Sequence, residues 1–280
     1  MQSNPDKQIV ELDNGVYACL YSGLTNAGFI IGDDGVLVID SLRVPSFARG
    51  LISDIKTVTS KPVRYVVDTH SHWDHSWGNE EFPDSTIIGH QNCYNEMVDV
   101  EWNDAWRKKV INANDPWSKE AGLVNITPPN LTFDTSMKLY LAGREIQLLY
   151  FGRAHTSGDT FIYLPAERIV FTGDVAQDAG MPFLGDSYPE EWPETDDKLV
   201  DLAVDRFVSG HGPIGNHKAM SESRDFMHKF VNTIKMAKEE GQDENAASNY
   251  TAATIVDQFA HWRGIERLKE AAAEVYRKLG

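Results

Sequence analysis

Residues 70–75, with the sequence HSHWDH, contain four side chains that can bind a metal ion. Imidazole and carboxylate groups are ligands of catalytic zinc, which keeps one coordination position open for water. A largely apolar run at residues 63–68 precedes the segment and predicts a β-strand. His70 and His72 can hold one metal from the strand end, while Asp74 and His75 face a second from the following turn. The segment predicts the start of a two-metal site.

Three further segments each place one potential ligand after a short apolar run, and they supply His155, Asp174 and His211. Ligands that follow separate strands of an α/β sheet meet at the strand ends. Taken alone, residues 70–75 could instead form a hydrogen-bonded turn or a structural zinc site. A structural site is closed, has four ligands and often uses cysteine, so this larger set of His and Asp residues favours an open catalytic site.

The sequence resembles the metallo-β-lactamase-fold hydrolases, whose HxHxDH signature is matched in full by residues 70–75. His155, Asp174 and His211 follow in the order of the family. Asp40, at the end of an apolar run, is similar to the early Asp that supports the family's ligands. The resemblance spans roughly residues 8–220 and implies an α/β fold, a four-layer αβ/βα sandwich, with two zinc ions at the sheet edges.

The resemblance also implies how the two metals are shared. His70, His72 and His155 would hold the first ion, and Asp74, His75 and His211 would hold the second. Asp174 would bridge the two ions. Imidazole with some carboxylate suits zinc, and iron or manganese are the alternative metals.

The chemistry implied by such a site is hydrolysis by a metal-bound hydroxide, because zinc lowers the pKa of its water to about 7. Asp74 and Asp174 are the expected catalytic residues, since either carboxyl group can pass a proton to the leaving group. The expected substrate is a small, apolar ester, lactone, or amide or lactam. The lactamase branch that places Cys at the second metal, with Lys three residues later, is not matched, since Asp174 and Gln177 stand there.

Other functions of the same fold remain open at this point. An iron-dependent oxygenase or oxidoreductase is one alternative, a phosphodiesterase or nuclease is another, and a non-catalytic metal-binding scaffold is a third. The net charge of -16 disfavours a nuclease, because phosphate binding needs clustered Lys and Arg.

Eight apolar or aromatic residues are candidates for substrate contacts. They lie in or beside the ligand motif, on a helix expected at residues 93–112, and on the loop 177–192, which we expect to form an apolar lid. They are Trp73, Trp77, Trp102, Trp106, Met181, Phe183, Leu184 and Tyr188. For the two tryptophans on the helix, packing in the core is the more common role.

The rest of the chain predicts one domain over residues 1–280, with a core at about 8–220 and a helical C-terminal extension at about 217–280. Hairpins are expected over residues 8–39, where Asn-Gly and Asp-Gly separate strand-like runs. Helices are expected at 46–58, 217–238 and 264–279, with a polar connector at 241–250.

The expected partner is a small-molecule substrate, without nucleic acid or membrane, and a homodimer is possible through the C-terminal helices. Residues 1–8 are polar and lack the apolar segment of a signal peptide. The expected location is the cytoplasm, or the periplasm or exterior if a signal peptide has been removed.

Overall fold

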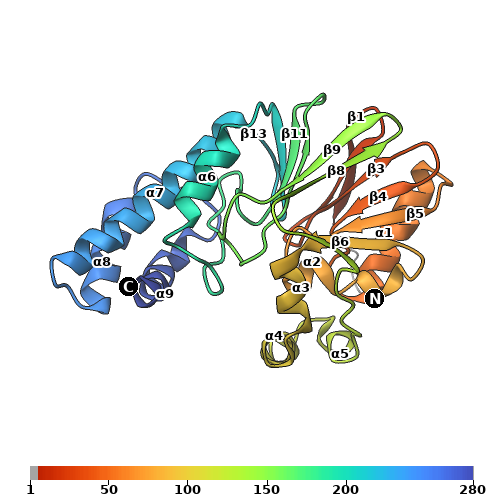
Figure 1. The fold of residues 1–280 in the computed structure, drawn as a ribbon. Coiled ribbons are helices and arrows are strands. Elements are labelled where there is room, and N and C mark those ends of the chain that lie inside the picture. The colour runs from red at the N-terminus through yellow and green to blue at the C-terminus, as the bar shows by residue number, and fades with distance from the viewer. Residues whose placement is uncertain (1–5, 280) are drawn as a thin grey trace.

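The computed structural model describes residues 6–279 and contains two mixed β-sheets packed face to face (Figure 1). Residues 1–5, which form most of the polar N-terminus considered above, lie outside the described range. The first sheet has seven strands in chain order, antiparallel from β1 to β4 and parallel from β4 to β7. Its strands are β1 (Lys7–Asp13), β2 (Val16–Tyr21), β3 (Ala27–Ile31), β4 (Val36–Ile39), β5 (Val63–Val67), β6 (Thr86–His90) and β7 (Leu131–Phe133).

The second sheet has six strands, and only its pair β11–β12 is parallel. Its strands are β8 (Ser136–Leu141), β9 (Arg144–Leu149), β10 (Phe161–Leu164), β11 (Ile169–Gly173), β12 (Arg206–Ser209) and β13 (Ile214–Asn216). Aliphatic residues from both sheets fill one core between them, including Leu37 and Val67 of the first and Ile162 and Val208 of the second. This core holds the two sheets together, because apolar area removed from water stabilises the packed state by about 25 cal/mol per Å².

Helices cover the outer face of each sheet. Helix α1 (Pro45–Val58) packs Leu51 and Ile55 against the first sheet, and α7 (His217–Glu239) packs Phe226 and Phe230 against the second. The layers are therefore helix, sheet, sheet and helix, which confirms the predicted αβ/βα sandwich. Figure 1 shows α7 continuing into α8 and α9, away from the strands.

Two predictions about the helices were wrong. The region 93–112 is not one helix but α3 (Gln91–Val98) and α4 (Val100–Asn112), because Asp99 between them accepts a hydrogen bond from Trp102 N at 3.0 Å and begins a new helix. The region 241–250 is not a connector, because Asp243 caps α8 (Glu244–Ile255) by accepting a bond from Ala246 N at 2.8 Å. Helix α8 has only a weak apolar stripe, so the spacing of its apolar residues did not predict it.

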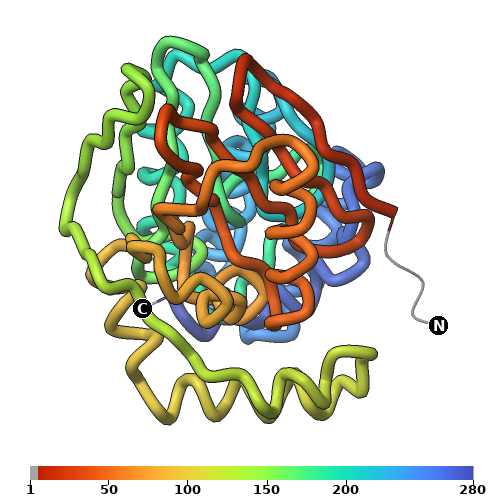
Figure 2. Tube along the Cα trace, turned by 90° about the vertical axis from the view of Figure 1, so that its right-hand side faces the viewer, coloured from red at the N-terminus to blue at the C-terminus, as the bar shows by residue number. Residues whose placement is uncertain are grey.

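The remaining helices lie near the ends of the strands and in the C-terminal part of the chain. They are α2 (Trp73–Ser76), η1 (Asn79–Glu81), α5 (Ser118–Ala121), α6 (Trp192–Val200), η2 (Ile265–Arg267) and α9 (Leu268–Lys278). Figure 2 shows the segment from α4 to α5 lying along one edge of the sandwich. No helix within residues 6–279 is long and apolar enough to cross a membrane.

Candidate metal centre

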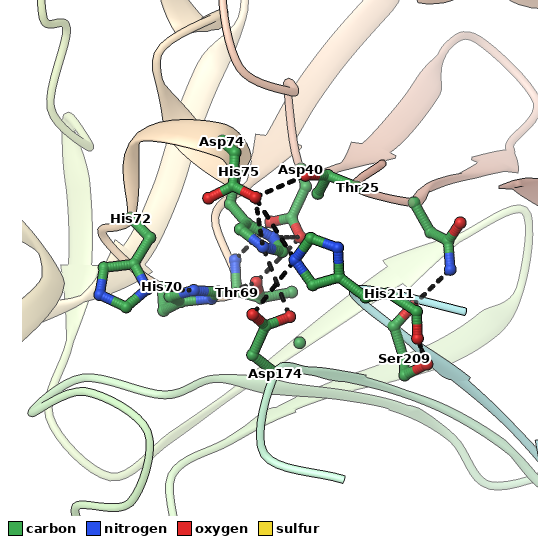
Figure 3. A network of polar contacts seen from close by, with 12 residues as sticks. Thr25, Asp40, Thr69, His70, His72, Asp74, His75, Asp174, Ser209 and His211 are labelled. Carbon is green, nitrogen blue, oxygen red and sulfur yellow. Dashed lines mark hydrogen bonds and ion pairs between the residues drawn. The ribbon is translucent and has the colours of Figure 1, made fainter. Parts of the chain in front are cut away.

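The seven predicted ligands come together at one edge of the sandwich, where strands of both sheets end. Figure 3 labels all of them except His155. The motif 70–75 follows β5, Asp174 follows β11 directly, and His211 follows β12. His155 lies in the segment between β9 and β10. Neighbouring parallel strands end at the same edge, and the facing sheet supplies the remaining ligands.

The first group of ligands consists of His70, His72 and His155, all buried. His72 Nδ1 lies 3.2 Å from His70 Nε2 and 2.8 Å from His155 Nε2. The three ring nitrogens therefore meet at one point. This is the arrangement of donors that a tetrahedral metal with an open fourth position requires.

The second group consists of Asp74, His75 and His211, with Asp174 between the groups. His211 Nε2 lies 3.3 Å from Asp74 Oδ2 and 3.3 Å from Asp174 Oδ2. Asp174 Oδ2 also lies 3.6 Å from His155 Nε2 of the first group. Figure 3 shows the two carboxylates on opposite sides of His75 and His211. Asp174 thus lies near both groups, and it also forms a set of neighbouring ligand atoms with His70 of the first group and His75 of the second.

The hydrogen bonds on the outer side of two rings make their Nδ1 atoms donors. His155 Nδ1 lies 3.1 Å from Phe183 O, and His211 Nδ1 lies 3.1 Å from Leu24 O. A carbonyl oxygen only accepts, so both Nδ1 atoms must donate, and in a neutral ring Nε2 is then an acceptor. His155 Nε2 therefore directs a lone pair at His72 Nδ1, 2.8 Å away, where a cation between the two nitrogens would be coordinated by both.

Two buried atoms of this cluster have no hydrogen-bond partner within the described residues. They are His75 Nε2 and Asp174 Oδ1, which lie 3.4 Å apart. A buried polar atom left unpaired costs about 1–3 kcal/mol. Both atoms point into the ligand cluster, and a bound divalent cation would satisfy both. The residues present therefore fit a metal.

Asp40 orients two of the ligands, and it adopts a positive φ of 61° at the end of β4. Its Oδ2 accepts hydrogen bonds from His75 Nδ1 at 2.8 Å and from Thr69 Oγ1 at 2.9 Å. The hydroxyl of Thr69 in turn lies 3.0 Å from His70 Nδ1 and accepts from it. One carboxylate thus fixes the tautomers of His75 and, through Thr69, of His70.

Electrostatics differ between the two groups. Burial lowers the pKa of His70 well below its usual range and that of His155 to about 3, so both rings are neutral at neutral pH. Burial would also lower the pKa of His211, but Asp174 and Asp74 raise it to about 10. The pKa of Asp174 is held well below its usual range, because His211 and His75 outweigh its burial. The second group therefore attracts a positive charge more strongly than the first.

The sequence profile of the Metallo-beta-lactamase superfamily matches residues 20–211, which include all seven ligands. This chain belongs to that superfamily. The 2,4-dinitroanisole O-demethylase subunit alpha of Nocardioides sp. (strain JS1661) is 27% identical over 191 residues, covering 65% of this chain and 51% of that protein. The match therefore spans about half the length of this relative.

Two further relatives carry the lactamase name. The type 2 metallo-beta-lactamase of Elizabethkingia meningoseptica is 22% identical over 241 residues, or 82% of this chain and 88% of that protein. A solved structure of a metallo-beta-lactamase from Pontibacter korlensis superposes with a TM-score of 0.63 at 19% identity and covers 80% of this chain and 99% of that one. At this identity, the likeness shows the fold alone.

Aromatic residues form one wall of the candidate metal centre, beside His72. The His72 ring stacks on the Trp102 ring with centroids 6.1 Å apart, and the centroid of Trp106 lies 5.0 Å from that of His72. Phe183 from the loop after Asp174 closes the group, with its ring 5.9 Å from that of Trp106. These three candidates for substrate contact thus lie against a predicted ligand.

The other candidates for substrate contact lie farther inside the protein or on another face. Trp77 is only 1% exposed and belongs to a hydrophobic cluster with Val110, so its position argues against the predicted substrate contact. Trp73 packs against the same cluster, next to Arg43. Met181 and Leu184 are 4% and 3% exposed and pack mainly into the C-terminal core, although Met181 also lines the cleft described below. The Tyr188 ring packs against Arg153, and Tyr188 N donates to Ala154 O at 2.8 Å. A position close to the ligand motif in sequence therefore did not predict whether a side chain faces the ligands or the hydrophobic core.

Two residues that complete the site were not predicted. Asp186 Oδ2 lies 3.0 Å from His72 Nε2 and accepts a second bond from Trp106 Nε1 at 3.2 Å. Thr25 Oγ1 donates to Asp74 Oδ2 at 2.6 Å. A lone acid in a loop carries no distinguishing sequence pattern, so only the fold shows the role of Asp186.

A cleft of about 790 Å³ opens beside the second group of ligands. Asp174 and His211 form part of its wall, and the turn 22–24, the loop that carries Phe183 and the C-terminal residues Arg263 and Arg267 form the rest. The volume is within the usual range of about 300–1,000 Å³ for small-molecule sites.

Proposed function

We propose that the protein is a dinuclear metallo-hydrolase that uses two zinc ions to open an ester, lactone or amide bond of a small substrate. The observation that carries the proposal is the pair of buried, unpartnered atoms, His75 Nε2 and Asp174 Oδ1, at the point where seven ligands converge. The two atoms face each other at 3.4 Å without a directed hydrogen bond, and a buried polar atom that lacks one costs about 1–3 kcal/mol, which a cation bound between them would remove.

The distances support the proposed division of the ligands between two ions. His70, His72 and His155 would hold the first ion, Asp74, His75 and His211 the second, and Asp174, which is near both groups, would be shared. Two zinc ions bound in this way would activate water near neutral pH and polarise the bond under attack. The proposed catalytic residues are Asp74 and Asp174, and Asp40 supports His75.

Asp74 is the residue we assign to proton movement. Thr25 and His211 contact its Oδ2, whereas its Oδ1 makes no hydrogen bond within the described residues. Burial would raise the pKa of Asp74, but His75 and His211 hold it well below its usual range, so the group is an ionised acceptor. Such a carboxylate can take a proton from the attacking water and pass it to the leaving group.

The aromatic wall made by Trp102, Trp106 and Phe183 supports a substrate with an apolar part, because these rings exclude water next to His72. The names of the relatives include a lactamase and an O-demethylase, so the family does not fix the bond that is cleaved. The acidic net charge of -16 supports a small molecule rather than a nucleic acid as the substrate.

The proposal is tested by metal analysis and a substrate panel on the full chain. Purified protein is loaded with zinc, its metal content is measured by mass spectrometry, and hydrolysis of an ester, a lactone, a β-lactam and a phosphodiester is followed. Two zinc ions per chain with turnover of an ester, lactone or lactam are expected, and Asp174→Ala should lose both metal and turnover. One iron per chain with oxygen uptake, or zinc without any turnover, would contradict the proposal.

A further inference from the structure

We propose that the cleft beside the metal centre selects substrates that carry an anionic group, a carboxylate or a group of the same charge, and that Arg263 and Arg267 bind that group. The inference rests on the proposed function for the position of the cleaved bond, because the same cleft is bordered by Asp174 and His211. The anion-binding cleft adds a class of substrate, anionic small molecules, to the proposed hydrolysis.

The backbone of Arg263 is fixed against the loop that follows Asp174. Arg263 N donates to Ala179 O at 2.9 Å, and Arg263 O accepts from Met181 N at 2.9 Å, so residues 180 and 263 form a parallel bridge. The C-terminal segment is therefore attached to the wall of the cleft. A side chain that starts from a fixed backbone loses less conformational entropy when it binds a ligand.

Two glycines make room for the Arg263 guanidinium. A Cβ atom at Gly212 would lie 2.2 Å from Arg263 Nη2, and one at Gly180 would lie 2.7 Å from the same atom. Gly212 directly follows the ligand His211 and has a φ of +89°. The guanidinium thus lies against bare backbone, beside the metal centre.

The charge of these two arginines is not neutralised by the protein. Within residues 6–279, neither Arg263 nor Arg267 has a carboxylate oxygen within 4 Å, although the chain has a net charge of -16. Arg277, by contrast, pairs with Glu244 and Glu274. Apart from Asp174, the acid that lines the cleft is Asp6.

The hydrogen-bonding capacity of the two guanidinium groups is also largely unused. Arg267 Nη2 lies 3.5 Å from Met181 O, at the limit of a hydrogen bond. An arginine side chain offers five donors in a planar fork, which matches the oxygens of a carboxylate or a phosphate. Two such forks at one cleft are suited to a single anionic group.

The rest of the lining indicates an amphiphilic substrate. Leu20, Leu24, Phe183 and Pro213 supply apolar surface to the same cleft. A substrate would place its charged end at Arg263 and Arg267, lay its apolar part along these residues, and present the bond to be cleaved at Asp174.

The first test measures binding to the metal-loaded full chain by titration calorimetry, with phenylacetate and its neutral analogue phenylacetamide as probes. Phenylacetate should bind at least about 10-fold more tightly, the size expected for hydrogen bonds to a charged group. Arg263→Gln and Arg267→Gln should each remove most of this preference without loss of metal, and Arg277→Gln is the matched control. Equal binding of phenylacetate by all variants would overturn the proposal, because the anion would then bind to the metals or to general surface charge.

The second test is kinetic and separates this proposal from the proposed function. The two substrates are the monophenyl ester of glutaric acid and methyl phenyl glutarate, which differ in one negative charge. We expect Arg263→Gln to lower kcat/KM about 10-fold or more for the charged ester only. Arg263→Lys should retain part of the preference for the charged ester over the neutral one. Turnover of both esters without a preference for the charged one would contradict the anion site and leave the proposed hydrolase standing. Arg-dependent binding of phenylacetate without turnover of either ester would contradict the proposed hydrolase and leave the anion site standing.

Discussion

The substitution Gly210→Ala should disable the metal centre although residue 210 binds no metal itself. A Cβ atom at this position would lie 2.1 Å from Asp174 Oδ1 and 2.6 Å from His75 Cε1. An approach of 2.1 Å is about 0.9 Å closer than the 3.0 Å below which Cβ contacts are essentially never found. Asp174, the ligand shared by both groups, must therefore move by about that distance.

The magnitude follows from this displacement. A misplacement of about 1 Å in a reacting or ligating group lowers activity by roughly 100-fold. We expect kcat/KM for the best ester of the panel to fall by about that factor, and the second equivalent of zinc to be lost on dialysis. Metal content and initial rates on the same preparation measure both effects.

The matched control is Gly50→Ala, on helix α1. No atom lies within 4 Å of a Cβ at this position, so the change should be neutral or should stabilise the helix by about 0.5–1 kcal/mol. Both variants add one methyl group, and only one of them contacts the ligands. Retention of two zinc ions and full activity in Gly210→Ala would refute the geometry described for Asp174.

Three further predictions test the groups around the ligands. Asp40→Ala leaves His75 Nδ1 without its acceptor, and zinc affinity measured by competition with a chelator should fall about 10- to 100-fold; an unchanged affinity would contradict the orienting role. Asp186→Asn should lower zinc affinity less, by about 10-fold, because the amide still contacts His72 Nε2 but carries no charge, and a loss as large as that of Asp40→Ala would be evidence against this ranking. In the metal-free protein the pKa of His211 is raised to about 10, against the effect of burial, by Asp174 and Asp74, so a metal must displace its proton at neutral pH. Affinity for the second zinc should therefore rise between about pH 6 and pH 9, by up to about tenfold per pH unit, in calorimetric titrations, and a flat profile would exclude this proton release.

The metal ligands were predictable from sequence because most of them lie at or shortly after the end of a strand, where chain geometry leaves little freedom. His70 follows β5 and Asp174 follows β11. The two sheets then bring these strand ends to one edge, as the family resemblance implied. The αβ/βα fold was implied by the same resemblance, and the superfamily match and the two sheets confirm it.

The surroundings of the ligands were not predictable in the same way. Trp77 is adjacent to the ligand motif but is only 1% exposed and packs in a hydrophobic cluster with Val110. Asp186 reaches the site through a side-chain contact with His72, and Arg263 through backbone bonds to residues 179 and 181, and no local pattern encodes either contact. Side-chain direction within irregular segments depends on packing against distant elements, and sequence spacing does not report it.

The number of zinc ions bound per chain tests the central claim most directly. Metal-free protein is titrated with Zn²⁺ in a calorimeter, and the stoichiometry is read from the equivalence points. We expect two equivalents, the first held by His70, His72 and His155 and the second by Asp74, His75 and His211. A single equivalent, or none, would contradict a dinuclear site that shares Asp174.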